Sequence, residues 1–361
     1  MNPPSPAQEP SWRLDEPFWR SNRVFGESLF FIRDDPAAAP RARLLFPPSG
    51  AVTLTSASRE IPYASPGDYL VDAATGIVTL PAGSRIPFTD RAALFPAIGQ
   101  EHCMAHRRGD EKAGLYFGEG HLFHDQQAEA TYEHLEPWRG FVPGAQLDLL
   151  PATARKLETA APLKVCIIGD SISTGCNASA VSRVPPRMPP YPDLWAGEIR
   201  RRTGCEVIIE NYAVSGTGMK YGVSVAAAVR DEAPDLVVIA YGMNDAGFIS
   251  LEEYMTLTAR ILDTMKQSGR GMEIILTASM LGNPEWAYAP TEKFLLFRDG
   301  LASLRGPGVA LADLTLLWTD LLKVKSYQDL TGNGVNHPND FGHRIHAQVL
   351  LDLLGIGLNN A

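Results

Sequence analysis

Ser171 has the sequence setting in this chain that is most suggestive of chemistry. It follows four apolar residues, 165–168, and the pair Gly169-Asp170, as a serine would at the end of a buried strand. Sheets of α/β proteins bind their ligands at the carboxyl ends of the strands. Asp170 can hydrogen-bond the backbone of the turn, which would present the Ser171 hydroxyl at that edge. A lone Gly-Asp-Ser is more often an ordinary turn, so the interpretation depends on later segments.

Three later residues could supply the other groups that acyl transfer needs. His337 is the candidate base, because an unperturbed imidazole titrates at about pH 6.5. Pro338 after it favours the start of a helix. Gly216 would offer a backbone N–H and Asn244 a side-chain amide, which with the N–H of Ser171 would form an oxyanion hole. Taken singly, these are ordinary turn or cap residues. Their order, and their positions after predicted strands or before a helix, favour a catalytic site, in which Asp245 would hold the Asn244 loop.

Alternating strands and helices from residue 163 onward would position these residues. We expect strands at 165–168, 207–210, 236–240, 274–277 and 309–312 from their apolar, β-branched character. We expect helices near 194–202, 224–231, 251–267, 292–304 and 338–354. This order predicts an α/β domain with a parallel sheet covered on both faces.

The preceding part of the chain has a different pattern. Short alternating runs between Pro- and Gly-rich clusters predict a β-rich, sandwich or jelly-roll-like domain at 22–150, with a hairpin turn at 72–76. Residues 1–21 read as a disordered lead-in without the features of a secretory signal, and 151–361 as the catalytic domain.

The four blocks together resemble the SGNH or GDSL-type serine hydrolases. The four name-giving residues of that family correspond to Ser171, Gly216, Asn244 and His337, and the resemblance covers about 163–361. It implies a flavodoxin-like three-layer α/β/α domain and a serine hydrolase that acts on carboxylic esters through an acyl-serine intermediate. It also implies no metal and no organic cofactor.

One position departs from the family pattern. An aspartate usually stands three residues before the histidine, where this chain has Gly334. We therefore expect a Ser171–His337 dyad, with a backbone carbonyl or an amide side chain orienting the imidazole. Asp340 and Asp329 are candidate substitutes, although Asp340 is more easily interpreted as an N-terminal helix cap.

Two further groups of residues could bind ligands. His102, His106, His121 and His124, with Cys103, Asp125 and His134 nearby, could form a transition-metal site, but surface or interface imidazoles explain them more simply. Trp286 and Tyr288 fall in a loop after the fourth predicted strand, where they could bind a sugar ring or an acyl chain, or simply pack.

Composition narrows the class of partner. The chain has 361 residues, 45% of them hydrophobic, a formal charge of −9, and no basic block, so nucleic acid and anionic membranes are not expected partners. Four cysteines without paired spacing predict free thiols and a cytoplasmic protein. The sequence leaves the oligomeric state open.

Some carbohydrate esterases of the resembled family carry a β-sandwich domain before the hydrolase domain and lack the usual aspartate. On that analogy we expect hydrolysis of short-chain, acetyl esters of carbohydrates. The alternatives are a general short-chain carboxylesterase, thioesterase or lipase, or a carbohydrate-binding protein with impaired catalysis.

Overall fold

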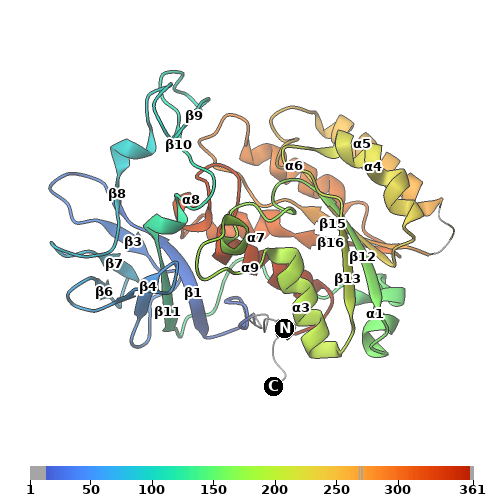
Figure 1. The fold of residues 1–361 in the computed structure, drawn as a ribbon, viewed down its shortest axis with the longest axis horizontal. Helices are drawn as coiled ribbons and strands as arrows, with labels where there is room; N and C mark the ends of the chain where they lie inside the picture. The colour runs from blue at the N-terminus through green and yellow to red at the C-terminus, as the bar shows by residue number, and fades with distance from the viewer. Residues whose placement is uncertain (1–13, 268, 270, 358–361) are drawn as a thin grey trace, which may run out of the picture.

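Two regions of different architecture lie side by side in the computed structural model, which describes residues 14–267, 269 and 271–357. Figure 1 shows strands and loops of the first region in blue to cyan, and a sheet flanked by helices in green to red. The predicted β-rich domain followed by an α/β domain is confirmed. No helix in the described part of the chain is long and apolar enough to cross a membrane.

The α/β domain contains a five-stranded parallel sheet. Its strands are β12 (Leu163–Gly169), β13 (Val207–Asn211), β14 (Leu236–Ala240), β15 (Glu273–Ala278) and β16 (Val309–Asp313). The order across the sheet is β13-β12-β14-β15-β16, the flavodoxin-like arrangement that the resemblance implied. All five predicted strands are confirmed. Four of them, β12, β14, β15 and β16, are buried along most of their length and leave a continuous apolar signal in the sequence, whereas the edge strand β13 is partly exposed. β12, which leads into Ser171, lies between β13 and β14.

Helices cover both faces of this sheet. On one face α3 (Tyr191–Thr203) packs against α9 (Asp340–Leu353). On the other, α4 (Met219–Asp231) packs on α5 (Leu251–Lys266), which packs on α6 (Thr291–Ala302). These are the five predicted helices. Four short helices were not predicted: α1 (Pro151–Glu158), α2 (Ser179–Ser182), α7 (Leu314–Leu321) and α8 (Tyr327–Leu330).

The start of α9 differs from the prediction. Pro338 was expected at the first helical position, but Asn339 caps the helix with its side chain, which accepts from Gly342 N at 3.1 Å. Asp340 is the first helical residue rather than the cap. The consequence is that His337 and Pro338 lie in the loop before the helix.

The β-rich domain contains two main sheets. The first, in the order β1-β11-β4-β5, is antiparallel, and the second has the order β6-β7-β3-β2-β8. The hairpin predicted at 72–76 is confirmed between β6 and β7. The strands of the first sheet are Arg23–Phe30, Gln127–Glu133, Thr53–Ser56 and Pro62–Tyr63. Those of the second are Leu70–Asp72, Ile77–Thr79, Arg41–Arg43, Ile32–Arg33 and Thr89–Asp90.

A separate ribbon projects from this domain toward the α/β domain. It consists of β9 (Cys103–Met104) and β10 (Leu115–Tyr116), paired antiparallel. Figure 1 shows it beyond β8, on the side of the molecule where α6 lies. Single 3₁₀ turns occur at Arg91–Leu94, His124–Gln126 and Leu147–Leu149.

The predicted disordered lead-in is wrong for residues 14–21, whereas 1–13 lie outside the described residues. Trp19 is buried and its Nε1 donates to Asp352 Oδ2 in α9 at 2.7 Å. Leu14 N donates to Glu198 Oε1 in α3 at 2.8 Å. Apolar side chains near the beginning of the chain thus anchor this segment to the α/β domain before the β-rich domain begins.

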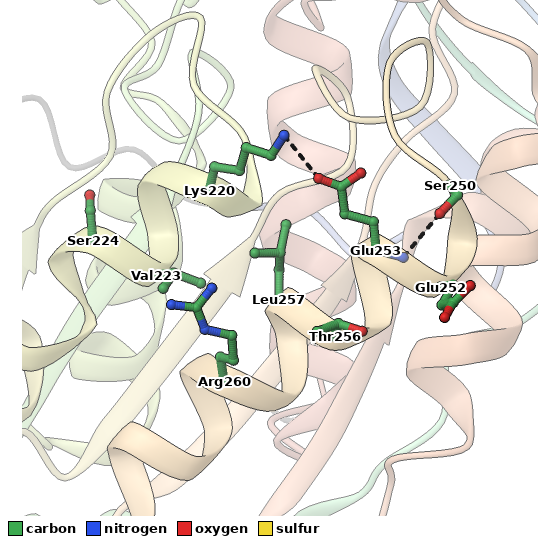
Figure 2. A pocket seen from close by; sticks show the side chains of 9 residues that line it. All are labelled: Lys220, Val223, Ser224, Ser250, Glu252, Glu253, Thr256, Leu257 and Arg260. Atoms are coloured by element: carbon green, nitrogen blue, oxygen red, sulfur yellow. Dashed lines mark hydrogen bonds and ion pairs between the residues drawn. The ribbon is translucent and has the colours of Figure 1, made fainter.

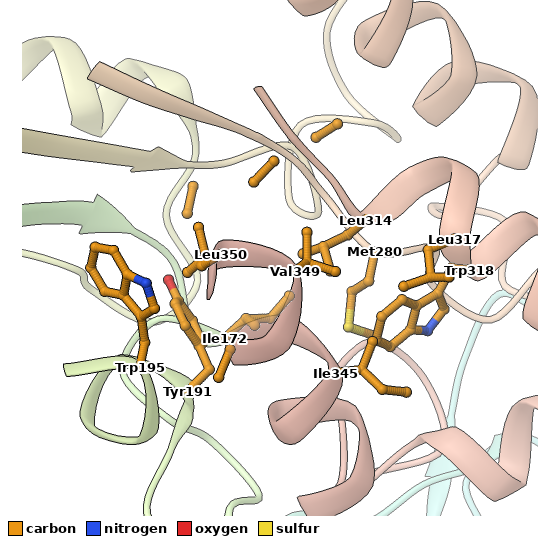
Figure 3. Close-up of a cluster of buried hydrophobic side chains, with 14 of the residues drawn as sticks. Ile172, Tyr191, Trp195, Met280, Leu314, Leu317, Trp318, Ile345, Val349 and Leu350 are labelled. Atoms are coloured by element: carbon orange, nitrogen blue, oxygen red, sulfur yellow. The ribbon is translucent and has the colours of Figure 1, made fainter. Parts of the chain in front are cut away.

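A large apolar cluster fixes the turn that carries Ser171. Ile172, directly after Ser171, is 5% exposed and belongs to this cluster. Figure 3 shows it among Tyr191 and Trp195 of α3, Met280 after β15, and Val349 and Leu350 of α9. Burial of such a side chain contributes about 1.5–3 kcal/mol, so the position of the neighbouring hydroxyl is set by packing.

Candidate active site

The structure brings Ser171 and His337 together although they are far apart in the sequence. Ser171 follows β12 in a series of turns, and Oγ lies 2.8 Å from Nε2 of His337 in the loop before α9. Both residues are almost fully covered, with exposures of 4% and 6%. The Asp170 carboxylate accepts from Ile172 N at 3.0 Å and so stabilises this turn, as the sequence suggested.

Asn177 orients the imidazole. Its Oδ1 lies 2.7 Å from Nδ1 of His337. Its Nδ2 donates to the carbonyls of Gly120 at 3.0 Å and Gly332 at 3.1 Å, so the amide nitrogen must face away from the histidine. Because Oδ1 can only accept, Nδ1 must carry the hydrogen. Nε2 is then left with a lone pair toward the Ser171 hydroxyl, which is the tautomer that a general base requires.

Neither aspartate considered in the sequence analysis takes this part. Asp340 Oδ1 accepts from Ser179 N at 2.8 Å, which ties α9 to α2. Asp329 accepts from Phe30 N at 2.7 Å and caps α8 through Ser326. An amide side chain was among the expected orienting groups, but Asn177 was not predicted. The signal was faint: a single asparagine, at φ 65°, in a left-handed conformation that asparagine tolerates better than most residues.

A carboxylate from the β-rich domain also reaches the histidine. Glu119 Oε2 lies 3.3 Å from His337 Nδ1, and Asn333 Nδ2 donates to Oε1 of the same carboxylate at 3.1 Å. Burial acts to raise the pKa of Glu119, but the interactions with His337 and the hydrogen bond from Asn333 together hold that pKa below its usual value. Glu119 was not among the predicted site residues.

The same part of the β-rich domain explains Gly334. This glycine has φ 88°, and a β-carbon there would lie 2.1 Å from the Tyr116 carbonyl oxygen and 2.6 Å from the Phe123 ring. The space that an aspartate side chain would need is therefore filled by the β-rich domain.

The two predicted oxyanion residues lie in the loops after β13 and β14, the two strands that flank β12. Gly216 is exposed, has φ 77°, and would meet nothing within 4 Å if it carried a β-carbon. Asn244 Nδ2 donates one hydrogen to Thr217 O at 2.9 Å, which joins the two loops and leaves its second N–H for another acceptor. Their role as oxyanion donors stays a prediction. Asp245 supports both loops: its Oδ1 accepts from Met219 N at 3.0 Å, and its backbone N–H donates to the Gly242 carbonyl of its own loop at 3.2 Å.

Burial controls the charge of the groups around the dyad. Burial raises the pKa of Asp170 to about 7, although the hydrogen bond from Ile172 and the nearby His337 act in the opposite direction. Burial lowers the pKa of His343 in α9 to about 4, so that this imidazole is neutral beside the dyad at pH 7.

The histidines near residue 100 are dispersed in the structure. His124 Nε2 bonds to the Pro185 carbonyl at 2.8 Å, and His121 Nδ1 lies 2.6 Å from Asp125 Oδ2. His106 packs against Tyr288 and His102 against Tyr116. Among the described residues no group of three or more His, Cys, Asp or Glu side chains is placed to hold a metal ion. The four cysteines, at 103, 166, 176 and 205, are free thiols.

A groove of about 850 Å³ lies elsewhere, between α4 and α5. Figure 2 shows Lys220 of α4 paired with Glu253 of α5, and the Ser250 hydroxyl accepting from the backbone at the start of α5. Its lining includes neither member of the dyad, so it is a surface feature separate from the candidate site.

Residues 167–345 match the model of the GDSL-like Lipase/Acylhydrolase family, a range that includes Ser171, Gly216, Asn244 and His337. The chain thus carries a domain of this family, an SGNH/GDSL-type hydrolase domain, preceded by a β-rich domain. The comparison with curated proteins gives no significant match.

Among solved structures, the chain is similar to a two-domain esterase active on acetylated mannans, at 16% identity and a TM-score of 0.48. The match covers 62% of this chain and only 56% of that protein. It is also similar to a mutant of an acetyl-xylooligosaccharide esterase from Geobacillus stearothermophilus, at 20% identity and a TM-score of 0.46, over 55% of this chain and 97% of that one.

Proposed function

We propose that this protein is a serine esterase that removes short acyl groups, acetyl above all, from a carbohydrate. The observation that carries the proposal is the hydrogen bond of 2.8 Å between Ser171 Oγ and His337 Nε2 inside a domain of an acylhydrolase family. The similar solved structures, an esterase active on acetylated mannans and an acetyl-xylooligosaccharide esterase, agree with this substrate class.

The proposed reaction begins with attack of Ser171 Oγ on the ester carbonyl carbon while its proton passes to His337 Nε2. The carbonyl oxygen becomes an oxyanion, which the N–H of Ser171, the N–H of Gly216 and the Asn244 amide would stabilise. Loss of one such donor typically costs about 2.7–4 kcal/mol. The C–O bond then breaks, and the alcohol leaves with the proton from Nε2. Water attacks the acyl-serine, gives its proton to Nε2, and releases the acid as the proton returns to Oγ.

A partly exposed aromatic pair supports a sugar substrate. Near the site, Phe248 is 67% exposed and stacks on Tyr288 at 4.9 Å. Phe248 shares a loop with Asn244, and an exposed aromatic face is suited to contact with an apolar sugar face.

The proposed function is tested with p-nitrophenyl acetate. The wild-type protein should release p-nitrophenol with turnover, and Ser171→Ala should reduce the rate to that of the uncatalysed reaction. Ser182→Ala, a change of the same kind outside the dyad, serves as the matched control and should keep turnover. Equal rates for wild type and Ser171→Ala would overturn the proposal and favour a carbohydrate-binding role.

The substrate class is tested separately. A series of p-nitrophenyl esters from acetate to decanoate should show the highest kcat/KM for acetate. Acetylated xylo- and manno-oligosaccharides should be deacetylated faster than p-nitrophenyl acetate at equal concentration. A maximum at long chains, or indifference to the sugar, would favour a general carboxylesterase or lipase.

A further inference from the structure

We infer that the β-rich domain supplies the negative charge of the catalytic apparatus: Glu119 stabilises the imidazolium of His337 in place of the aspartate that Gly334 cannot provide. The inference rests on the proposed function, because it concerns the same serine and histidine. It goes beyond it by making the active site a product of both domains, with Glu119 as a positioning residue that acts through His337.

The first support is the contact itself. The carboxylate stands 3.3 Å from His337 Nδ1, the nitrogen that carries hydrogen when Asn177 accepts from it at 2.7 Å. Asn177 can fix the tautomer and ring orientation, but it is neutral. The proton that Nε2 takes from Ser171 makes the ring cationic, and only an anion nearby offsets that charge. Glu119 is the carboxylate in contact with Nδ1.

The second support is that the segment around Glu119 is built to hold this place. Gly118 N donates to the Asn333 carbonyl at 3.2 Å, and Asn333 Nδ2 donates to Glu119 Oε1 at 3.1 Å. The Gly120 carbonyl accepts from Asn177 at 3.0 Å and from Ser182 Oγ at 2.9 Å. Three consecutive residues of the β-rich domain are therefore bonded to the catalytic domain beside the histidine.

The third support is that the loop which leaves no room for an acid at position 334 carries an acid, Glu119, of its own. The backbone at Tyr116 fills the space over Gly334, and the chain then continues for three residues to Glu119. The same loop thus excludes an acid from position 334 and brings an acid of its own. Glu119 is 53% exposed at the side chain, so its charge is partly screened by solvent.

The test is the kinetics of Glu119→Gln, which keeps the shape and removes the charge. Since Asn177 still holds the tautomer, the loss should be far smaller than the roughly 10⁴-fold loss caused by a wrong tautomer. We expect kcat to fall about 10- to 100-fold with KM changed less than about twofold, because the carboxylate acts on the imidazolium and not on bound ester. Glu119→Asp should recover part of kcat, and Glu111→Gln, an exposed glutamate of the same domain, should match wild type.

The pH profile separates a charge effect from a structural one. An anion beside the ring favours its protonated form, so its removal should move the acid limb of kcat/KM to lower pH, by up to about one unit. The other ionisable groups facing the ring are Asp170, whose pKa burial raises to about 7, and His343, whose pKa burial lowers to about 4. Both are present in wild type and in Glu119→Gln, so they cancel in the difference.

Labelling of Ser171 with diethyl p-nitrophenyl phosphate keeps this inference distinct from the proposed function. The reaction needs the serine and histidine but no recognition of a natural ester. Slower labelling in Glu119→Gln than in wild type, with a displaced acid limb, supports the inference even if no ester is turned over. Equal labelling rates and superimposed pH profiles, or an unlabelled wild type, would overturn it.

Discussion

At the scale of the residue, the reactive state of His337 depends on a neutral amide whose orientation is fixed from the other side. Two carbonyls, those of Gly120 and Gly332, accept from Asn177 Nδ2 and turn Oδ1 toward the ring. One carbonyl belongs to each domain. Asn177 thus sets the tautomer that the dyad needs, which is one of the two roles of the usual aspartate. The other role, the supply of negative charge, must be filled by another residue.

Asn177→Gly tests this at the same scale. Glycine accepts the φ of 65° without strain, so the loss reports the side chain. We expect kcat for p-nitrophenyl acetate to fall roughly 10²-fold, because the ring is no longer held as a base. Stability should also fall by about 1–3 kcal/mol, because the Gly332 carbonyl loses its donor, whereas the Gly120 carbonyl keeps the hydrogen bond from Ser182 Oγ.

Ser182→Ala is the control for the stability part. It removes one donor from the Gly120 carbonyl without touching the ring. It should lower the melting temperature slightly and leave kcat unchanged. A wild-type kcat in Asn177→Gly would show that the ring needs no amide.

At the scale of the element, the loop of residues 331–337 and the β-rich segment that covers it have mutually adapted shapes. Asn333 Oδ1 accepts from the backbone N–H groups of Val335, Asn336 and His337, which winds the loop tightly before α9. Asn283 of the loop after β15 donates to the Gly334 carbonyl at 2.8 Å. The loop that carries His337 is therefore held by its own hydrogen bonds, by Asn283, and by the close contact of the β-rich domain at Gly334.

Gly334→Ala tests how closely the β-rich domain approaches the loop that carries His337. The β-carbon would lie 2.1 Å from the Tyr116 carbonyl oxygen, so one of the two segments must shift. The matched control is Gly109→Ala, a glycine of similar φ, 76°, around which the added carbon meets nothing within 4 Å. The control should lose about 1–2 kcal/mol from the positive φ alone. Gly334→Ala should lose clearly more in urea unfolding, and its kcat should fall.

Gly334→Asp tests the residue that the family usually has at this position. An aspartate at this position should not raise activity, because the space for its carboxylate is occupied. Losses no greater than in the Gly109 variant, or a gain of activity with aspartate, would show that the β-rich segment yields easily.

At the scale of the whole molecule, the sequence predicted the elements of each domain and the pairing of Ser171 with His337, but not the contacts between the two domains. The five strands, the five longer helices and the blocks of Ser171 and His337 follow from local patterns of apolar residues and turns. The contact of Glu119 with His337 spans more than half of the chain and leaves no local pattern. The interpretation of residues 14–21 as disordered failed for the same reason, because Trp19 is anchored by Asp352 near the other end of the chain.

The two domains also share a buried ionic cluster. Lys325, in the loop before α8, pairs with Glu27 of β1, and both side chains are 0% exposed. Lys325 Nζ also donates to the Arg43 carbonyl at 2.7 Å, and Glu27 accepts from Tyr132 Oη at 2.6 Å. The apolar core is likewise continuous from Leu29 of β1 to Leu350 of α9. A contact of this kind belongs to a permanent interface, so we expect the domains to unfold together.

Lys325→Met tests whether the molecule is a single cooperative unit. Removal of one partner leaves Glu27 buried without its counter-charge, which typically costs about 3–5 kcal/mol. Lys323→Met is the matched control two residues away, because Lys323 pairs with Asp320 at the surface, where its side chain is 69% exposed, and should cost less than about 1 kcal/mol. Glu27→Gln combined with Lys325→Met should recover part of the loss, since the unpaired charge is then gone.

Calorimetry should show one transition that moves as a whole in Lys325→Met. Two separate transitions, or a loss no larger than in Lys323→Met, would mean that the β-rich domain is only loosely attached, and a loosely attached domain could not hold Glu119 against the histidine.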